Sequence, residues 1–163
     1  MPGDRRAAGA VEHRKEGAFG GELRAGGAVA GLKRLGVGDR ITTILEPHDF
    51  LPAVGQGAIA LVTRADDAAT RAAVATIGDG TTGTQLAAER AFLAVLDGSC
   101  RTPIAGHAAV AGGRVAFRGL VLRPDGSACI EVARDGAAAD AARIGREAGE
   151  ELRARLPAGF LDP

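Results

Sequence analysis

The sequence predicts an α+β fold, in which a three-stranded antiparallel sheet in the C-terminal part of the chain carries helices on one face. Three observations predict it: an apolar helical pattern over residues 84–97, three strand-like runs between residues 104 and 133, and an amphipathic helical pattern over residues 140–156. Because the three strands follow one another through short turns, they are expected to pair as an antiparallel meander. The flanking helices are then expected to cover one face of the sheet.

Ahead of this unit the sequence predicts a smaller α/β segment. Glycine interrupts every run in residues 1–26, where weak order is expected. Residues 28–35 form a short apolar-to-basic segment, and one more helical turn is expected at residues 41–45. Residues 58–63 are a nearly continuous apolar run, typical of a strand buried on both faces, and residues 68–77 fit a helix.

The helix that precedes the three strands has a capping signal and one unusual residue. Thr82 and Gln85 have the spacing of a capping box. Nearly the whole circumference of the helix is apolar, so deep packing is expected. Glu89 falls within the apolar sector, and a buried carboxylate needs a partner, which Arg90 or Arg101 is expected to supply. A structural role is therefore favoured for Glu89 over catalysis.

The three strands are predicted at residues 104–110, 114–122 and 127–133. Gly112-Gly113 joins the first two, and such a dipeptide is typical of a two-residue hairpin turn. The third strand contains Cys129, which is interpreted as a packing residue because apolar neighbours flank it.

Composition excludes several classes of function. Lys plus Arg and Asp plus Glu each number 20, so no overall charge attracts nucleic acid or a membrane surface. No apolar run approaches the roughly 20 residues that span a bilayer, and the N-terminus lacks the apolar region of a secretory signal, so a cytoplasmic location is expected. Two cysteines without CxxC spacing and three scattered histidines predict neither a disulfide framework nor a metal site.

Cys100 lies in the turn between the long helix and the first strand, after Gly98 and before Pro103. Glycine can end a helix and proline cannot continue one, so the thiol is expected in an exposed loop. Arg101 beside it would favour the thiolate, the form that reacts with carbon electrophiles. The plainer interpretation is a small apolar residue without chemistry, which is the commoner role of an isolated cysteine.

Three sequence blocks together resemble one enzyme family. They are AGLKRLG at residues 30–36, LPAVGQGA at residues 51–58, and AERAFL at residues 88–93, which leads into the cysteine loop. Their order and spacing are similar to those of porphobilinogen deaminase, also called hydroxymethylbilane synthase. The resemblance covers the chain from about Val29 to the C-terminus.

The resemblance implies a role for three residues. Cys100 would hold a dipyrromethane cofactor, one per chain, through a covalent thioether. Arg34 would bind substrate carboxylates, a task that suits the planar guanidinium fork. Gln56, between two glycines, would be a polar contact to cofactor or substrate, although the same residues also fit a plain turn before a strand. No metal ligand is implied, and the family's catalytic aspartate has no counterpart here.

The family's activity is the condensation of four porphobilinogen molecules into a linear tetrapyrrole with release of ammonia, by proteins that are usually monomeric. By this resemblance residues 1–26 are an aberrant N-terminus, residues 27–80 a remnant of the family's second and first α/β domains, and residues 81–163 the cofactor-carrying α+β domain. The family's first domain and most of its second are expected to be absent, through a truncated or frame-shifted reading frame. The chain alone is therefore expected to be inactive.

Two other interpretations stay open at this point. The chain can be a small non-catalytic α+β binding module in which the thiol of Cys100 is idle. It can also be a reading frame without a stable product.

Overall fold

A computed structural model describes residues 23–24, 29–98 and 102–161 of the chain. Cys100 and Arg101 lie outside the described residues, as does most of the glycine-rich segment at residues 1–26. The chain divides into two compact units, residues 1–50 and residues 51–163, and each is considered by itself. The three-part division predicted from the resemblance stays a prediction.

The described residues of the first unit form one short helix, a 3-10 turn and a two-stranded parallel sheet. Helix α2 (Val29–Arg34) is followed by a 3-10 turn, η1 (Gly38–Arg40), and strand β2 (Ile41–Thr43), which pairs with β1 (Leu23–Arg24). The helical turn predicted at residues 41–45 is therefore wrong. The β-branched run Ile-Thr-Thr favours a strand, because branched side chains lose rotamer freedom in a helix.

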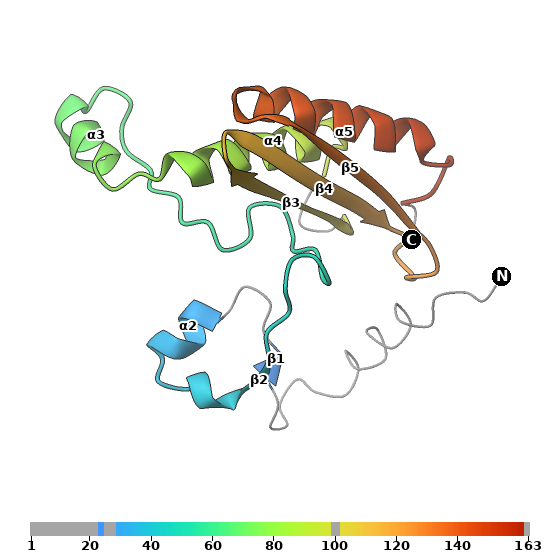
Figure 1. The fold of residues 1–163 in the computed structure, drawn as a ribbon, viewed down its shortest axis with the longest axis horizontal. Helices are drawn as coiled ribbons and strands as arrows, with labels where there is room; N and C mark the ends of the chain where they lie inside the picture. The colour runs from blue at the N-terminus through green and yellow to red at the C-terminus, as the bar shows by residue number, and fades with distance from the viewer. Residues whose placement is uncertain (1–22, 25–28, 99–101, 162–163) are drawn as a thin grey trace. The chain divides into compact units, whose positions relative to one another are not determined.

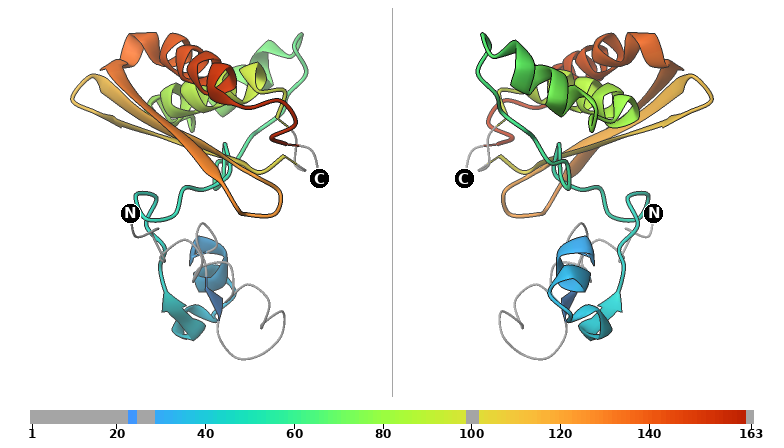
Figure 2. Two further views of the ribbon diagram at one scale, coloured as in Figure 1. Left: turned by 90° about the vertical axis from the view of Figure 1, so that its right-hand side faces the viewer. Right: turned by 90° about the vertical axis from the view of Figure 1, so that its left-hand side faces the viewer.

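The second unit contains the predicted sheet, and Figures 1 and 2 show α4 and α5 side by side on one of its faces. Its strands β3 (Ile104–Ala111), β4 (Arg114–Leu122) and β5 (Cys129–Ala137) are antiparallel, in the order β3-β4-β5. The helices are α4 (Gly80–Val95) and α5 (Ala141–Arg155), with the 3-10 turn η2 (Ala138–Asp140) before α5. The predicted α+β class is confirmed.

Alternation along β4 decides which face of the sheet is covered. Val115, Phe117 and Val121 are buried beneath the helices, whereas Arg114 and Leu122 are exposed on the opposite face. This period of two is the pattern of a sheet that is covered on one side only. The core formed between the sheet and the two helices consists of Ala88, Phe92, Leu96, Ile104, Ala108, Val115, Phe117, Val121, Val132, Ala141, Ile144, Ala148, Leu152 and Phe160.

The hairpin predicted at Gly112-Gly113 is confirmed. The two glycines have φ of 56° and 74°, and Ala111 pairs with Arg114 on either side of them. Two consecutive positive φ angles are the requirement of a type I′ turn, which only residues such as glycine meet at little cost. Strand β5 continues past the predicted end at residue 133, because its pairing with β4 extends to Arg114 opposite Ala137.

Helix α4 begins earlier than predicted. Asp79 is the N-cap residue, and its carboxylate accepts a hydrogen bond of 2.6 Å from the amide of Thr82, which also lowers the pKa of Asp79. The capping box predicted at Thr82 is therefore wrong, since an equally good cap lies three residues upstream.

The prediction that the whole of α4 is deeply packed is also wrong. Ala87 and Ala94 face solvent, which small side chains tolerate without penalty.

Helices α4 and α5 touch through glycines. A Cβ atom at Gly145 would overlap the carbonyl of Ala88, and one at Gly149 would lie 3.0 Å from the carbonyl oxygen of Phe92. Glycine is needed where two backbones approach this closely. On the sheet side, the ring of Phe92 packs over Gly119 and against Phe117, with ring centroids 4.9 Å apart.

The strand predicted at residues 58–63 is wrong. These residues form no strand, and Ile59 and Val62 are 90% and 94% exposed. The neighbouring helix prediction is confirmed by α3 (Ala68–Ala75), whose N-cap residue Asp67 accepts a hydrogen bond from the amide of Thr70. An apolar run becomes a buried strand only when another strand pairs with it. In the second unit, no strand of the sheet β3-β4-β5 pairs with residues 58–63.

Replacing Gly145 by Ala tests the close helix contact. Although Ala favours a helix by about 1 kcal/mol, the new methyl must displace the Ala88 carbonyl, so Gly145→Ala is expected to lower the free energy of unfolding by about 1–3 kcal/mol. Gly83→Ala, within α4 and facing open space, is the matched control, and is expected to raise stability by up to about 1 kcal/mol. Urea denaturation measures both. Equal stabilisation by the two substitutions would contradict the packing described.

Candidate functional site

The loop that carries Cys100 is fixed at both ends by described residues. Helix α4 ends at Val95, and two residues later Asp97 has φ of 50°; the amides of Asp97 and Gly98 donate to the carbonyls of Ala94 and Leu93. This is a Schellman ending with the left-handed position at Asp97, a residue type that tolerates it, rather than at the predicted Gly98. Gly98 is needed for another reason, because a Cβ there would overlap the side chain of Leu93.

The second end of the loop joins β3. The carbonyl of Pro103 accepts a hydrogen bond of 2.9 Å from the amide of Leu122, which anchors the chain just before the strand begins at Ile104. On the α4 side, the guanidinium of Arg153 in α5 donates to the carbonyl of Val95 at 3.0 Å. A cation at a helix C-terminus satisfies exposed carbonyls and opposes the helix dipole.

Gln56 occupies the second position of a tight turn. The amide of Gln56 donates to the carbonyl of Ala53 at 3.0 Å, and that of Ala58 donates to the carbonyl of Gly55 at 3.2 Å. Gly55 and Gly57 have φ of 71° and 85°, as two overlapping type II turns require at their third positions. The side chain of Gln56 is exposed and therefore accessible to a bound molecule.

The turn is held by Glu89, whose side chain is buried and only 5% exposed as a residue. Its Oε2 accepts a hydrogen bond of 2.8 Å from the amide of Gly55, and its Oε1 accepts one of 2.9 Å from the amide of Ala108. The carboxylate thus joins α4, β3 and the glycine turn. It also links two of the sequence blocks, LPAVGQGA and AERAFL.

The partners of Glu89 differ from the prediction. Arg90 is exposed and does not pair with it, and Arg101 lies outside the described residues. The carboxylate is instead satisfied by two backbone amides, with Nδ1 of His107 3.5 Å from Oε1. A sequence pattern reveals side chains that are able to pair but not the backbone amides that a fold leaves unpaired.

The same contacts protect the free edge of the sheet. The amides of Gly106 and Ala108 point away from β4, the former toward the carbonyl of Pro52 at 3.0 Å and the latter toward Glu89. Val54 packs beside Gly106, so the segment before the turn runs along the edge of β3. An edge strand covered in this way presents fewer open amides to another chain.

Cys129 is exposed at the start of β5, so its interpretation as a packing residue is wrong. It is opposite Leu122 on the uncovered face of the sheet. Partial burial raises the pKa of the Cys129 thiol, and the nearby carboxylate of Glu131 raises it further. Cys129 is therefore mainly an unreactive thiol at neutral pH, because the thiolate is the nucleophile.

Arg34 is the last residue of α2 and is exposed. It belongs to the first unit, whereas Gln56 belongs to the second. The predicted roles of Arg34, Gln56 and Cys100 remain predictions. Within the described ranges no cluster of His, Cys, Asp or Glu side chains has the arrangement of a metal site, and no helix has the length and apolar character to cross a bilayer.

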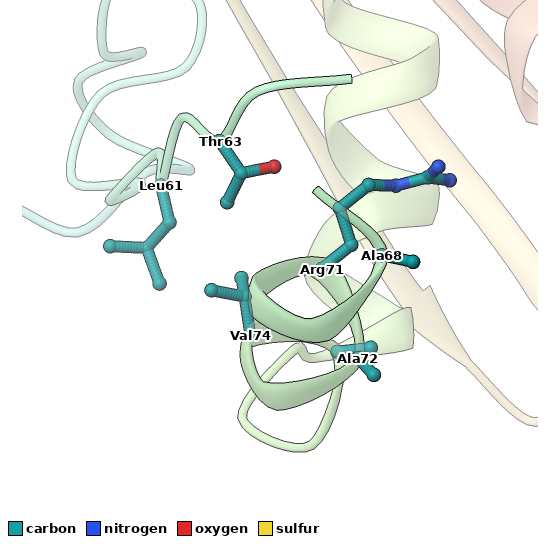
Figure 3. Close-up of a pocket in the computed structure, with 7 residues that line it drawn as sticks. Leu61, Thr63, Ala68, Arg71, Ala72 and Val74 are labelled. Atoms are coloured by element: carbon teal, nitrogen blue, oxygen red, sulfur yellow. The ribbon is translucent and has the colours of Figure 1, made fainter. Parts of the chain in front are cut away.

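An open hollow lies beside α3 in the second unit (Figure 3). It has a volume of about 570 Å³ and is lined by Leu61, Thr63, Ala68, Arg71, Ala72, Val74 and Ala75. Its lining is largely aliphatic and includes none of the predicted site residues. The hollow is therefore not part of the candidate site.

Replacing Glu89 by Gln tests the junction at the glycine turn. A Gln amide nitrogen cannot accept a hydrogen bond from a backbone amide, so one buried donor loses its partner and stability is expected to fall by about 1–3 kcal/mol. Glu131→Gln, on the exposed sheet face, is the control and is expected to change stability by less than about 0.5 kcal/mol. Chemical denaturation measures stability, and faster hydrogen exchange at Gly55 or Ala108 locates the loss. Unchanged stability of Glu89→Gln would show that the two bonds do not hold the turn.

Comparisons with known proteins identify the family. The family model described as "Porphobilinogen deaminase, C-terminal domain" matches residues 84–154, and "Porphobilinogen deaminase, dipyromethane cofactor binding domain" matches residues 9–72. Curated porphobilinogen deaminases from Nitrobacter hamburgensis and Nitrobacter winogradskyi are 57% and 58% identical over 134 residues, which is 82% of this chain. The protein of that name from Paracoccus denitrificans is 52% identical over 135 residues, 83% of the chain.

The chain spans about 42% of the length of the Nitrobacter relatives and 43% of that of the Paracoccus relative. The two family models follow one another along the sequence and together include the glycine turn, Glu89 and the cysteine loop. On these matches, the chain belongs to the porphobilinogen deaminase family.

Proposed function

We propose that this chain supplies the cofactor-carrying part of a hydroxymethylbilane synthase, with dipyrromethane attached to Cys100. The observation that carries the proposal is the junction at Glu89. This residue fixes the Gln56 turn to α4, and α4 leads directly into the loop with Cys100. The turn with the exposed glutamine and the two described ends of the loop that carries the proposed attachment residue are thus held by the same two elements, α4 and β3.

The chemistry of the chain's two cysteine thiols fits the attachment of a dipyrromethane to Cys100. A thioether to an activated methylene carbon needs a thiolate, and Cys100 lies beside Arg101, whose positive charge favours that form. The chain's other thiol, Cys129, has a raised pKa and is not expected to compete. Dipyrromethane would supply the pyrrole to which the growing product is joined.

Other residues would bind and orient anionic groups. The exposed guanidinium of Arg34 is suited to a carboxylate, because its planar fork donates two parallel hydrogen bonds. The amide of Gln56 would donate or accept one further hydrogen bond at the glycine turn. In this proposal Cys100 is a tether and leaves proton transfer to other groups.

The complete activity would be the condensation of four porphobilinogen molecules with release of ammonia, in the cytoplasm. The catalytic aspartate that the resemblance implies has no counterpart in this sequence, so the chain alone is proposed to be inactive. The alternative of a non-catalytic module with an idle thiol is not favoured, because matches to two family models cover both parts of the chain.

Intact-protein mass spectrometry tests the attachment. A chimera in which this chain replaces the matched part of the Nitrobacter hamburgensis relative, produced in cells that make porphobilinogen, is expected to gain the mass of two pyrrole units. Cys100→Ser is expected to abolish the gain and Cys129→Ser, the matched control, to retain it. A chimera without added mass, or with the mass on Cys129, would reject the proposal.

Steady-state kinetics of the same chimera test Arg34. Hydrogen bonds to charged groups contribute about 1.5–3 kcal/mol, so Arg34→Ala is expected to lower kcat/KM about 10- to 100-fold, and Arg34→Lys is expected to recover part of the loss. Arg146→Ala, an exposed arginine on α5, is the control and is expected to leave kcat/KM unchanged. Equal effects of Arg34→Ala and Arg146→Ala would remove Arg34 from the substrate site.

A further inference from the structure

The point where the cysteine loop leaves α4 is held from α5 by Arg153. Its guanidinium Nη1 donates a hydrogen bond of 3.0 Å to the carbonyl oxygen of Val95, the last residue of α4, and lies 3.9 Å from a carboxylate oxygen of Asp97. Val95 and Arg153 are 58 residues apart in the sequence, so this contact is tertiary and not part of the local helix ending. One side chain thus contacts both the end of the helix and the start of the loop.

The backbone contacts between the two helices explain why Arg153 reaches this point. A Cβ atom at Gly145 would overlap the carbonyl of Ala88. Further along both helices, a Cβ atom at Gly149 would lie 2.9 Å from the Cβ of Val95. Because the contacts advance in the same direction along α4 and α5, the helices run parallel and their C-terminal ends lie together. Arg153 follows Gly149 by four residues, about one helical turn, and therefore lies on the same face of α5.

Two helix C-terminal ends side by side concentrate partial negative charge. Each end carries the equivalent of roughly half an elementary charge, on carbonyls without intrahelical partners. At the end of α4, the carbonyls of Leu93 and Ala94 accept hydrogen bonds from backbone amides, whereas that of Val95 accepts one from the guanidinium of Arg153. Arg153 itself belongs to the last turn of α5, so its positive charge opposes the partial charges of both ends.

Apolar packing anchors the same end of α4 independently. Leu96 is buried in the core between the sheet and the helices, whereas the next residue, Asp97, is exposed and has φ of 50°. Loss of the Arg153 side chain is therefore expected to loosen the start of the loop without unfolding α4. A residue with this effect can alter the position of the loop while the fold is retained.

We propose that Arg153 is a positioning residue for the condensation of porphobilinogen, because it fixes the point from which the loop with Cys100 departs. This role rests on the proposed function, in which the growing product is tethered to that loop. A shift of the loop start displaces the tethered product. The groups proposed to bind free substrate, Arg34 and Gln56, are carried by other segments, namely α2 and the glycine turn.

Hydrogen exchange in the full 163-residue chain tests the contact without any activity. Arg153→Ala is expected to speed exchange at the amides of Asp97 and Gly98 at least about fivefold, because the last turn of α4 opens more often. Arg155→Ala is the matched control, since Arg155 also lies on α5 and donates to a backbone carbonyl, that of Glu131 at 2.8 Å on β5. This control is expected to leave exchange at Asp97 and Gly98 within about twofold of the unchanged chain.

Steady-state kinetics of the Nitrobacter hamburgensis chimera test the positioning. Arg153→Ala is expected to lower kcat about 5- to 20-fold and to leave KM within about twofold, because a displaced tether disturbs bond formation but not the binding of free substrate. Arg153→Lys keeps a cation and a donor and is expected to restore kcat to within about threefold of the unchanged chimera. Arg155→Ala is expected to leave both constants within about twofold.

Three results would overturn the proposed role of Arg153. These are equal exchange at Asp97 and Gly98 in the two alanine variants, equal kcat in the two variant chimeras, and a raised KM with unchanged kcat. Circular dichroism of each variant separates a displaced loop from lost folding. A chimera without the pyrrole mass would reject the proposed function and the effect on kcat with it, whereas a chimera with the mass and an unchanged kcat in Arg153→Ala would reject the positioning role alone.

Discussion

The arrangement of the second unit depends on one buried carboxylate. Glu89 is carried by α4, and its two oxygens accept backbone hydrogen bonds from the turn at Gly55 and from β3 at Ala108. Burying an ionised carboxylate is unfavourable unless such donors satisfy it, and a bond to a charged group contributes about 1.5–3 kcal/mol when they do. The residue therefore stabilises a junction between the glycine turn and two elements, α4 and β3, that already pack together in the core. Without it, the segment at residues 51–57 would retain mainly Val54 and the Pro52 carbonyl as attachments.

This junction connects the fold to the proposed chemistry. Helix α4 has Glu89 near its middle and the cysteine loop at its end, and α5 holds that end through Arg153. The glycines of α5 bring the two helices into backbone contact, which limits sliding of one along the other. The turn with an exposed Gln56 and the start of the loop that carries Cys100 are thus attached to the same helix pair, although Gln56 and Cys100 are more than 40 residues apart in sequence.

The sequence predicted the C-terminal unit well because its signals are local. The Gly112-Gly113 turn, the alternation along β4 and the apolar stripe of α5 each specify a structure within a few residues. The predictions that failed depended on contacts with other parts of the chain, which a local sequence pattern does not contain. Residues 58–63 have the composition of a buried strand, but no strand of the second unit's sheet pairs with them, and Glu89 accepts hydrogen bonds from backbone amides, which every sequence contains. Among the candidate site residues, Gln56 could be assigned to a glycine turn from the sequence itself. The roles of Cys100 and Arg34 were predicted from the family resemblance alone.

The anchored ends of the cysteine loop limit how far an attached molecule can be carried. Gly98 and Thr102 are separated by four peptide links, which reach about 14 Å even when fully extended. A chain of pyrroles that grows from Cys100 would soon exceed that distance. On the proposed attachment to Cys100, each new unit would therefore have to be accommodated by groups outside this loop rather than by travel of the tether.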